Sequence, residues 1–130
     1  MPHSKQIGTV LLVEDNPVVR QIISLTLAQD GYRVVTATNG REALDYLHDN
    51  PSPCTIVLDL HMPVMGGEEF LQLREQDRAL AAIPVLLCSG DAEEEGPGLA
   101  AIYGVTYCPK PFRVDHLLHL IAECRVYTAE

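Results

Sequence analysis

The chain has 130 residues, about the length of one ordinary domain, and apolar residues make up 47% of it. No apolar run approaches the roughly 18 residues that a membrane-spanning helix needs, and the first residues lack the apolar stretch of a signal peptide, so we expect a cytoplasmic protein without a membrane contact. The 18 acidic and 9 basic residues give a net charge of −9 without a basic cluster, which argues against direct binding to nucleic acid.

Strand-like and helix-like stretches alternate through the first part of the chain. Residues 7–13 form an apolar run without polar alternation, which is typical of a strand buried on both faces. Asn16-Pro17 then signals the start of a helix. Apolar residues recur behind it at helical spacing, namely Val19, Ile22, Ile23 and Leu27. Residues 33–37 predict a second strand, and Asn39 is expected to cap a second helix that turns Ala43, Leu44 and Leu47 inward.

The same alternation continues to the end of the chain. Residues 54–58, 83–88 and 105–108 predict three further strands. The third helix contains Phe70, Leu71 and Leu73, and the last one has the cleanest amphipathic spacing, with Val114, Leu117, Leu118 and Ile121. The segment 91–98 between them is acidic and then broken by glycine and proline, so we expect the fourth helix to start late and to be short or mobile.

Five strands that alternate with helices predict an α/β protein with a parallel sheet and helices on both faces. No internal repeat or linker divides the sequence, so residues 1–130 are expected to form a single domain with a core from about 7 to 125. The four cysteines include no Cys-x-x-Cys pair, and we expect reduced thiols that pack as small apolar side chains.

Chemically active side chains follow four of the five predicted strands. Glu14 and Asp15 follow the first strand and Asp59 the third. Ser89 follows the fourth strand and Lys110 the fifth. Because the carboxyl ends of parallel strands meet at one edge of a sheet, these groups are expected to converge there.

Three carboxylates at one place repel one another unless a cation neutralises them. Mg²⁺ suits an oxygen-rich site that shares its ligands with a phosphate. A carboxylate beside such a metal can act as a nucleophile toward a phosphoryl group, and Lys110 and Ser89 could neutralise and orient that group. The residues therefore predict an acyl-phosphate site.

Four short motifs carry a family resemblance that runs from about residue 7 to about residue 125: Val13-Glu14-Asp15-Asn16, Asp59 followed by Met62-Pro63, Ser89-Gly90, and Lys110-Pro111-Phe112. In this order and at these strand ends they resemble the signature of the response-regulator receiver domain of two-component signalling, of the chemotaxis-regulator type. The resemblance implies a doubly wound, flavodoxin-like (βα)5 fold with the strand order 2-1-3-4-5.

The resemblance also implies a role for each matched residue. Asp59 matches the phosphoacceptor, and Glu14 and Asp15 match the acidic pair that holds Mg²⁺ together with Asp59. His61 matches the position whose backbone carbonyl also binds the metal. Lys110 matches the lysine that pairs with the phosphoryl oxygens.

Two further matches concern switching. Ser89 matches the switch hydroxyl that moves to the phosphoryl group, and Tyr107 matches the aromatic partner that follows it. The Lys110-Pro111 bond resembles a cis peptide of the family. The surface that responds to phosphorylation is then expected to consist of the fourth helix, the fifth strand and the last helix.

As a family member, the chain would take a phosphoryl group from a sensor histidine kinase or a histidine phosphotransfer protein. It would be a signalling module rather than an enzyme, because it would modify only its own Asp59. The downstream target stays unnamed, and a phosphorylation-dependent homodimer stays open.

Other interpretations remain beside this one. The chain could be a receiver module of a larger hybrid kinase or transcription regulator, although the Met1 start favours a stand-alone protein. An aspartyl-phosphate phosphatase would need a second aspartate near Asp59 and a cap domain. A flavin-binding domain would need a loop rich in Ser, Thr or Gly after the first strand, where Glu14 and Asp15 stand instead.

Overall fold

The computed structural model describes residues 7–90, 95–110 and 113–128, and the side chains of 125–128 lie outside this description. Five parallel strands form one sheet in the order β2-β1-β3-β4-β5. Their bounds are β1 Thr9–Val13, β2 Arg33–Ala37, β3 Thr55–Asp59, β4 Val85–Ser89 and β5 Thr106–Pro109. The predicted doubly wound α/β fold and its strand order are confirmed.

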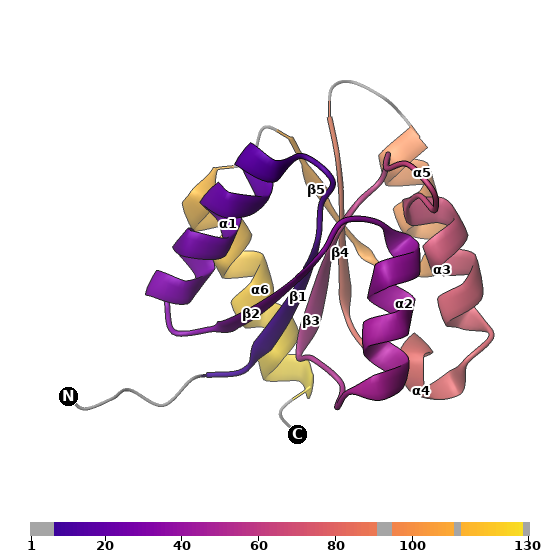
Figure 1. Cartoon of the computed structure of the whole chain (residues 1–130), viewed down its shortest axis with the longest axis horizontal. Coiled ribbons are helices and arrows are strands. Elements are labelled where there is room, and N and C mark those ends of the chain that lie inside the picture. Colours follow the sequence, from indigo (N-terminus) through magenta and orange to yellow (C-terminus); the bar gives the residue numbers. More distant parts are fainter. Residues whose placement is uncertain (1–6, 91–94, 111–112, 129–130) are drawn as a thin grey trace.

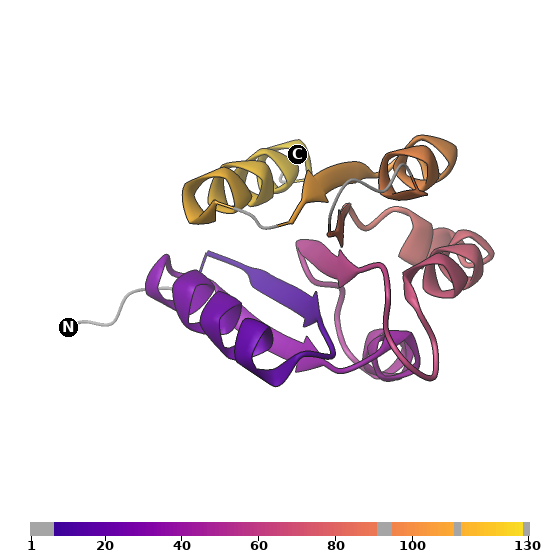
Figure 2. The same cartoon turned by 90° about the horizontal axis from the view of Figure 1, so that it is seen from above.

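Helices cover both faces of the sheet, as Figures 1 and 2 show. On one face lie α1 (Pro17–Gln29) and α6 (Val114–Thr128). The other face carries α2 (Gly40–Asp49), α3 (Gly67–Glu75), the short α4 (Arg78–Ala81) and α5 (Glu95–Tyr103). None of the helices within the described ranges has the length and apolar character needed to span a membrane.

The central strands are buried on both sides. Every residue of β3 and β4 is buried, which explains why these strands show no polar alternation in the sequence. Two apolar clusters result, one on each face of the sheet. The first includes Phe70 and Leu71 from α3, and the second includes Leu27 from α1 and Ile121 from α6.

The predicted helix starts at Asn16 and Asn39 are confirmed. The Asn16 side chain accepts hydrogen bonds from the backbone N–H groups of Val18 and Val19, and Pro17 occupies the first helical position. The Asn39 side chain accepts from the N–H of Glu42. The first cap has a functional consequence, because it fixes the chain directly after Glu14 and Asp15.

Two apolar residues do not face the core as their spacing predicted. Ile22 in α1 is 56% exposed and Val114 at the start of α6 is 50% exposed. The prediction that α6 has the cleanest amphipathic pattern is therefore wrong at its first turn. The predicted inward set of α2 is buried as expected: Ala43, Leu44 and Leu47.

Two helices also differ from expectation. The helix α4 was not predicted from the sequence; it is only one turn long and is capped by the side chain of Asp77. The helix expected to start late begins at Glu95 and includes Gly96, Pro97 and Gly98, because proline is tolerated in a first turn. Residues 91–94 of the acidic run lie outside the described residues.

Candidate functional site

Three carboxylates gather at the carboxyl edge of the sheet. Glu14 and Asp15 follow β1, and Asp59 is the last residue of its neighbour β3. One carboxylate oxygen from each lies within 4.8 Å of the others. Glu14 and Asp59 are buried, whereas Asp15 is exposed. The predicted convergence of these side chains is therefore present in the structure.

Among the described residues, Lys110 is the only one whose cationic side chain forms hydrogen bonds with these carboxylates. Its Nζ donates to Glu14 Oε1 and to Asp59 Oδ1, each at 3.0 Å. Its backbone N–H donates to the Ser89 carbonyl at 2.8 Å, which fixes the end of β5 beside the end of β4. The lysine thus joins the first, third and fifth strands across the edge of the sheet.

Burial and charge act in opposite directions on Asp59 and Lys110. Burial raises the pKa of Asp59; the hydrogen bond from Lys110 lowers it, but the neighbouring carboxylates of Glu14 and Asp15 add to the rise. Burial alone would lower the pKa of Lys110, but its hydrogen bonds and charge attraction to Asp59 and Glu14 outweigh burial and raise it. Lys110 therefore stays charged, and the Asp59 carboxylate is destabilised by its surroundings.

We expect Asp59→Asn to raise the free energy of unfolding at neutral pH by about 1 kcal/mol in the absence of divalent metal. Because the folded protein holds the Asp59 proton more tightly than the unfolded chain does, the stability contributed by this group is full below the unfolded pKa. It is lost as the pH rises through the raised folded pKa. Urea denaturation of both proteins from about pH 4 to about pH 7 should show a gap that widens with pH. A gap independent of pH would contradict the raised pKa of Asp59.

The donor set fits a divalent cation. Three carboxylates and one ammonium leave an excess of negative charge where a hard cation would find only oxygen ligands. Glu14, Asp15 and Asp59 would hold it. When bound, Mg²⁺ neutralises phosphoryl oxygens and the carboxylates around them.

Ser89 and Tyr107 form a pair beside this cluster. The two hydroxyl groups share a hydrogen bond of 3.1 Å, and the Tyr107 hydroxyl also donates to the Ser89 carbonyl at 3.4 Å. The structure therefore brings together the two residues that the sequence predicted as switch residues, although their role in switching stays a prediction. The predicted cis peptide at Pro111 lies outside the described residues.

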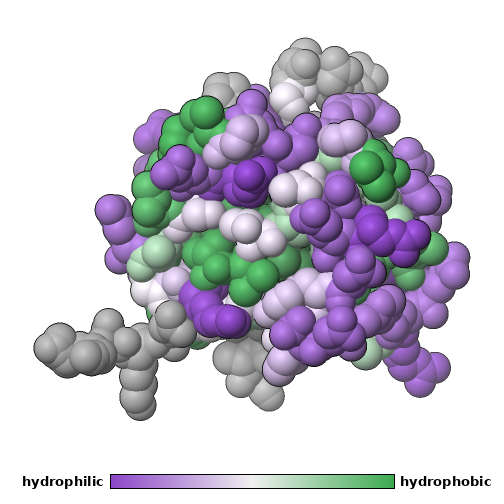
Figure 3. Space-filling view, viewed as in Figure 1, coloured by the Kyte–Doolittle hydropathy of each residue, from purple (hydrophilic) through white to green (hydrophobic). Residues whose placement is uncertain are grey.

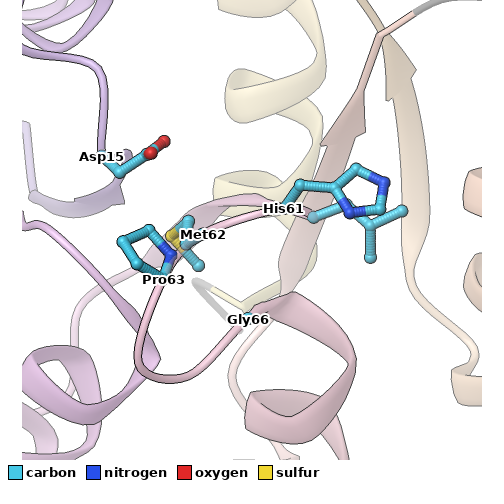
Figure 4. Close-up of a pocket in the computed structure, with 6 residues that line it drawn as sticks. Asp15, His61, Met62, Pro63 and Gly66 are labelled. Carbon is cyan, nitrogen blue, oxygen red and sulfur yellow. The ribbon is translucent and has the colours of Figure 1, made fainter.

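An open pocket of ≈ 400 Å³ lies beside the carboxylates (Figure 4). Its lining combines Asp15 with the segment that follows β3: Leu60, His61, Met62, Pro63 and Gly66. The His61 ring is exposed and points away from Asp15, and its Nε2 lies 3.3 Å from Glu95 Oε1 at the start of α5. This side-chain orientation does not test the prediction that the His61 backbone carbonyl binds the metal.

The loop around the pocket contains a strained residue. Val64 has φ 70°, which a β-branched residue rarely adopts, and the Met65 N–H donates to the Pro63 carbonyl at 2.7 Å across it. Strained backbone of this kind costs about 1–3 kcal/mol and is concentrated at functional sites. The surrounding structure holds the pocket loop in a fixed turn.

One residue of the site, Arg20, was not predicted from the sequence. Arg20 lies one turn into α1, and its Nη1 donates to the backbone carbonyls of Glu14 at 3.0 Å and Asp15 at 3.4 Å. The Asn16 N–H also donates to Glu14 Oε2 at 3.1 Å. These contacts fix the acidic pair. The only sequence signal for Arg20 is its spacing from Asn16, since residues four apart share one face of a helix.

Known proteins match the chain over most of its length. The sequence model of the response regulator receiver domain family matches residues 10–122. The transcriptional regulatory protein SphR for alkaline phosphatase synthesis, from Synechococcus elongatus, is 33% identical over 95% of this chain and 50% of its own. The CAI-1 autoinducer sensor kinase/phosphatase CqsS of Vibrio cholerae is 30% identical over 94% of this chain and 18% of its own. The chain thus spans half of the first relative and a smaller part of the second.

Solved structures give the same result. The chemotaxis response regulator CheY4 of Vibrio cholerae has a TM-score of 0.80 and 30% identity, over 93% of this chain and 99% of that one. A response regulator receiver protein from Pseudomonas putida has a TM-score of 0.82 and 28% identity, over 94% and 99% of the two chains. Together with the family match, these likenesses show that the chain belongs to the response regulator receiver domain family.

Proposed function

We propose that Asp59 is the phosphoacceptor of a two-component phosphorelay. The observation that carries this proposal is the Asp59 carboxylate held 3.0 Å from Lys110 Nζ within the cluster of Glu14 and Asp15. A carboxylate beside an ammonium and two further carboxylates combines a nucleophile with groups that could neutralise a phosphoryl group, directly or through a bound cation. The phosphodonor would be a phosphohistidine of a sensor histidine kinase or a histidine phosphotransfer protein.

In the transfer, an Asp59 oxygen forms the new O–P bond while the P–N bond of the phosphohistidine breaks. The electron pair of that bond leaves with the imidazole nitrogen, which takes up a proton. Lys110 offers its ammonium to the charge on the phosphoryl oxygens, and Ser89 can offer its hydroxyl. Glu14, Asp15 and Asp59, with the His61 carbonyl, would hold Mg²⁺.

The output of the module would be a shift between two conformations. Ser89 would leave Tyr107 for the phosphoryl group, and the surface formed by α5, β5 and α6 would respond. Residues 1–130 would act as one domain with a core from about 7 to 125. The chain would modify only itself, so it would be a signalling module and not an enzyme with a free substrate.

An apolar stripe on α1 marks a surface for the phosphodonor. Val18, Ile22 and Leu25 follow one another at helical spacing and are 65%, 56% and 56% exposed. The helix starts directly after the acidic pair, and Figure 3 shows apolar side chains along it at the left of the view. Exposed apolar patches commonly bind proteins. A partner on α1 could place its histidine above Asp59.

We expect Ile22→Glu to lower phosphotransfer from a histidine kinase that labels the wild-type protein by about tenfold, since truncating an anchor side chain costs more than 1 kcal/mol. The rate of labelling by acetyl phosphate, which needs no docking surface, should not change. Equal loss with both donors would show that α1 acts on the site itself and would contradict a docking role.

A cytoplasmic location is part of the proposal. Cys88 and Cys108 lie in register on β4 and β5, are buried, and are thiols rather than a disulfide. A side-chain hydrogen bond with Cys108 and burial both raise the pKa of the Cys88 thiol, which keeps it protonated and unreactive. Such a pair suits a reducing compartment.

Beryllofluoride, which mimics a phosphoryl group on a carboxylate, tests the proposed function. With Mg²⁺ present, it should change the nuclear magnetic resonance signals of the wild-type protein around Asp59, Ser89 and Lys110. Asp59→Asn should show no change, while Asp77→Asn, an exchange of the same kind at the α4 cap, should respond like the wild type. Failure of the wild-type protein to respond would contradict the proposal.

A further inference from the structure

The first turn of α5 rests directly on the Ser89–Tyr107 pair. Gly96 is buried there, and a methyl group on it would lie 2.4 Å from Ser89 Oγ and 2.5 Å from Tyr107 Cε1. Both distances are far below van der Waals contact. At Gly98 in the same turn, a methyl group would have nothing within 4 Å. Of these two positions, only 96 needs a glycine for steric reasons.

The atoms that meet residue 96 are the ends of movable side chains. A serine hydroxyl moves by rotation about χ1, and a tyrosine ring moves by rotation about χ1 and χ2. The three nearest atoms from other elements of the described structure all belong to the Ser89 and Tyr107 side chains. A side chain at 96 would therefore displace the Ser89–Tyr107 pair before it displaced the sheet.

The same turn is also connected to the loop that follows Asp59. Glu95 Oε1 lies 3.3 Å from His61 Nε2, and both side chains are largely exposed. The start of α5 thus touches the site from two sides, through His61 and through the Ser89–Tyr107 pair. At Gly96, the contact with the Ser89–Tyr107 pair leaves no room for a side chain.

We propose that Gly96 is a positioning residue: because it has no side chain, it leaves the space that Ser89 and Tyr107 need for their hydrogen-bonded arrangement. This inference rests on the proposed function, because it assigns the arrangement to the unphosphorylated state. In that arrangement Tyr107 engages the Ser89 hydroxyl. When Ser89 turns toward a phosphoryl group on Asp59, it leaves the space beside residue 96.

An alanine at 96 should therefore destabilise the resting arrangement more than the phosphorylated one. A ligand that binds only the phosphorylated-like arrangement then binds more tightly, because less of its binding free energy is spent on displacing the resting arrangement. We expect Gly96→Ala to bind beryllofluoride about tenfold more tightly than the wild-type protein does. The same contact would act in the opposite direction on phosphorylation: when Ser89 and Tyr107 move, the first turn of α5 loses its packing against them.

Gly98→Ala is the matched control, because it brings the same gain in helix propensity in the same helix without the close contact. Two measurements would be made on the full chain. The first follows the ring signals of Tyr107 in the free protein by nuclear magnetic resonance, assigned with Tyr107→Phe. The second titrates beryllofluoride in the presence of Mg²⁺. Only Gly96→Ala should shift the ring signals and tighten binding.

Unchanged ring signals in Gly96→Ala, or beryllofluoride binding equal to or weaker than that of Gly98→Ala, would overturn the inference. A purely structural role for Gly96 would lower the midpoint of urea denaturation and leave the beryllofluoride affinity alone. If the wild-type protein bound no beryllofluoride, the proposed function would fail. The ring signals would still decide whether Gly96 holds the pair.

Discussion

Replacing Lys110 by methionine is expected to slow labelling by acetyl phosphate by about 100-fold or more, because a single preorganised donor to the reacting oxygens commonly contributes that much. The ammonium is the group that bonds to both Asp59 and Glu14. Without it, these two buried carboxylates lose the only cationic partner that they have among the described residues. The free energy of unfolding should fall by about 2 kcal/mol, less than for a fully buried pair because Lys110 is partly exposed.

Mg²⁺ separates these two effects of Lys110→Met. The cation should restore most of the lost stability, because it neutralises the same carboxylates, but it should not restore the labelling rate. Arg113→Met is the control. It also removes one positive charge, but from an exposed side chain that lies three residues after Lys110. It should change stability by less than about 0.5 kcal/mol and leave labelling intact. Normal labelling of Lys110→Met would contradict the assigned role of the lysine.

Arg74→Met is expected to lower the free energy of unfolding by about 2–3 kcal/mol, because one buried and one partly buried carbonyl group lose their donor. Arg74 is 5% exposed, and its Nη2 donates to the Ala81 carbonyl at 2.9 Å and the Ile83 carbonyl at 2.7 Å. Burial lowers the pKa of this guanidinium, but an arginine remains charged at any pH of interest. The side chain fastens α3 to the segment that enters β4.

The matched control for Arg74→Met is Arg78→Met, which changes an exposed arginine in the neighbouring α4. Urea denaturation with an unchanged slope should show a large shift of the midpoint for Arg74→Met and almost none for Arg78→Met. Equal midpoints would mean that water replaces the guanidinium at the two carbonyls without cost. Acetyl phosphate labelling should survive in both variants, because neither arginine contacts the carboxylate cluster.

The sequence predicted the sheet well because its central strands are buried on both faces. A run such as residues 85–89 has no exposed side to carry polar residues, so it stands out in the sequence. Helix starts at Asn16 and Asn39 were equally readable, since a side-chain cap is a local interaction. The carboxylate cluster followed from topology, because parallel strands bring their carboxyl ends to one edge.

Features that depend on side-chain packing or on single hydrogen bonds between distant elements could not be predicted. Helical spacing assigned Ile22 to the core, but spacing does not show where the covered face of α1 ends. The one-turn α4 is too short for a periodic pattern. The glycine and proline at 96–98 indicated a break, while the helix uses Gly96 to approach Ser89 and Tyr107. The partners of Arg20 and Arg74 are backbone carbonyls, which residue types in the sequence do not identify.

The most direct test of the phosphoacceptor assignment is the intact mass of the protein after incubation with acetyl phosphate and Mg²⁺. We expect one added phosphoryl group on the wild-type protein, and reduction of this adduct with borohydride should convert residue 59 alone to homoserine. Asp59→Asn should gain no mass under the same conditions. Phosphorylation that persists in Asp59→Asn, or a reduced residue elsewhere in the chain, would contradict the assignment of Asp59 as the phosphoacceptor.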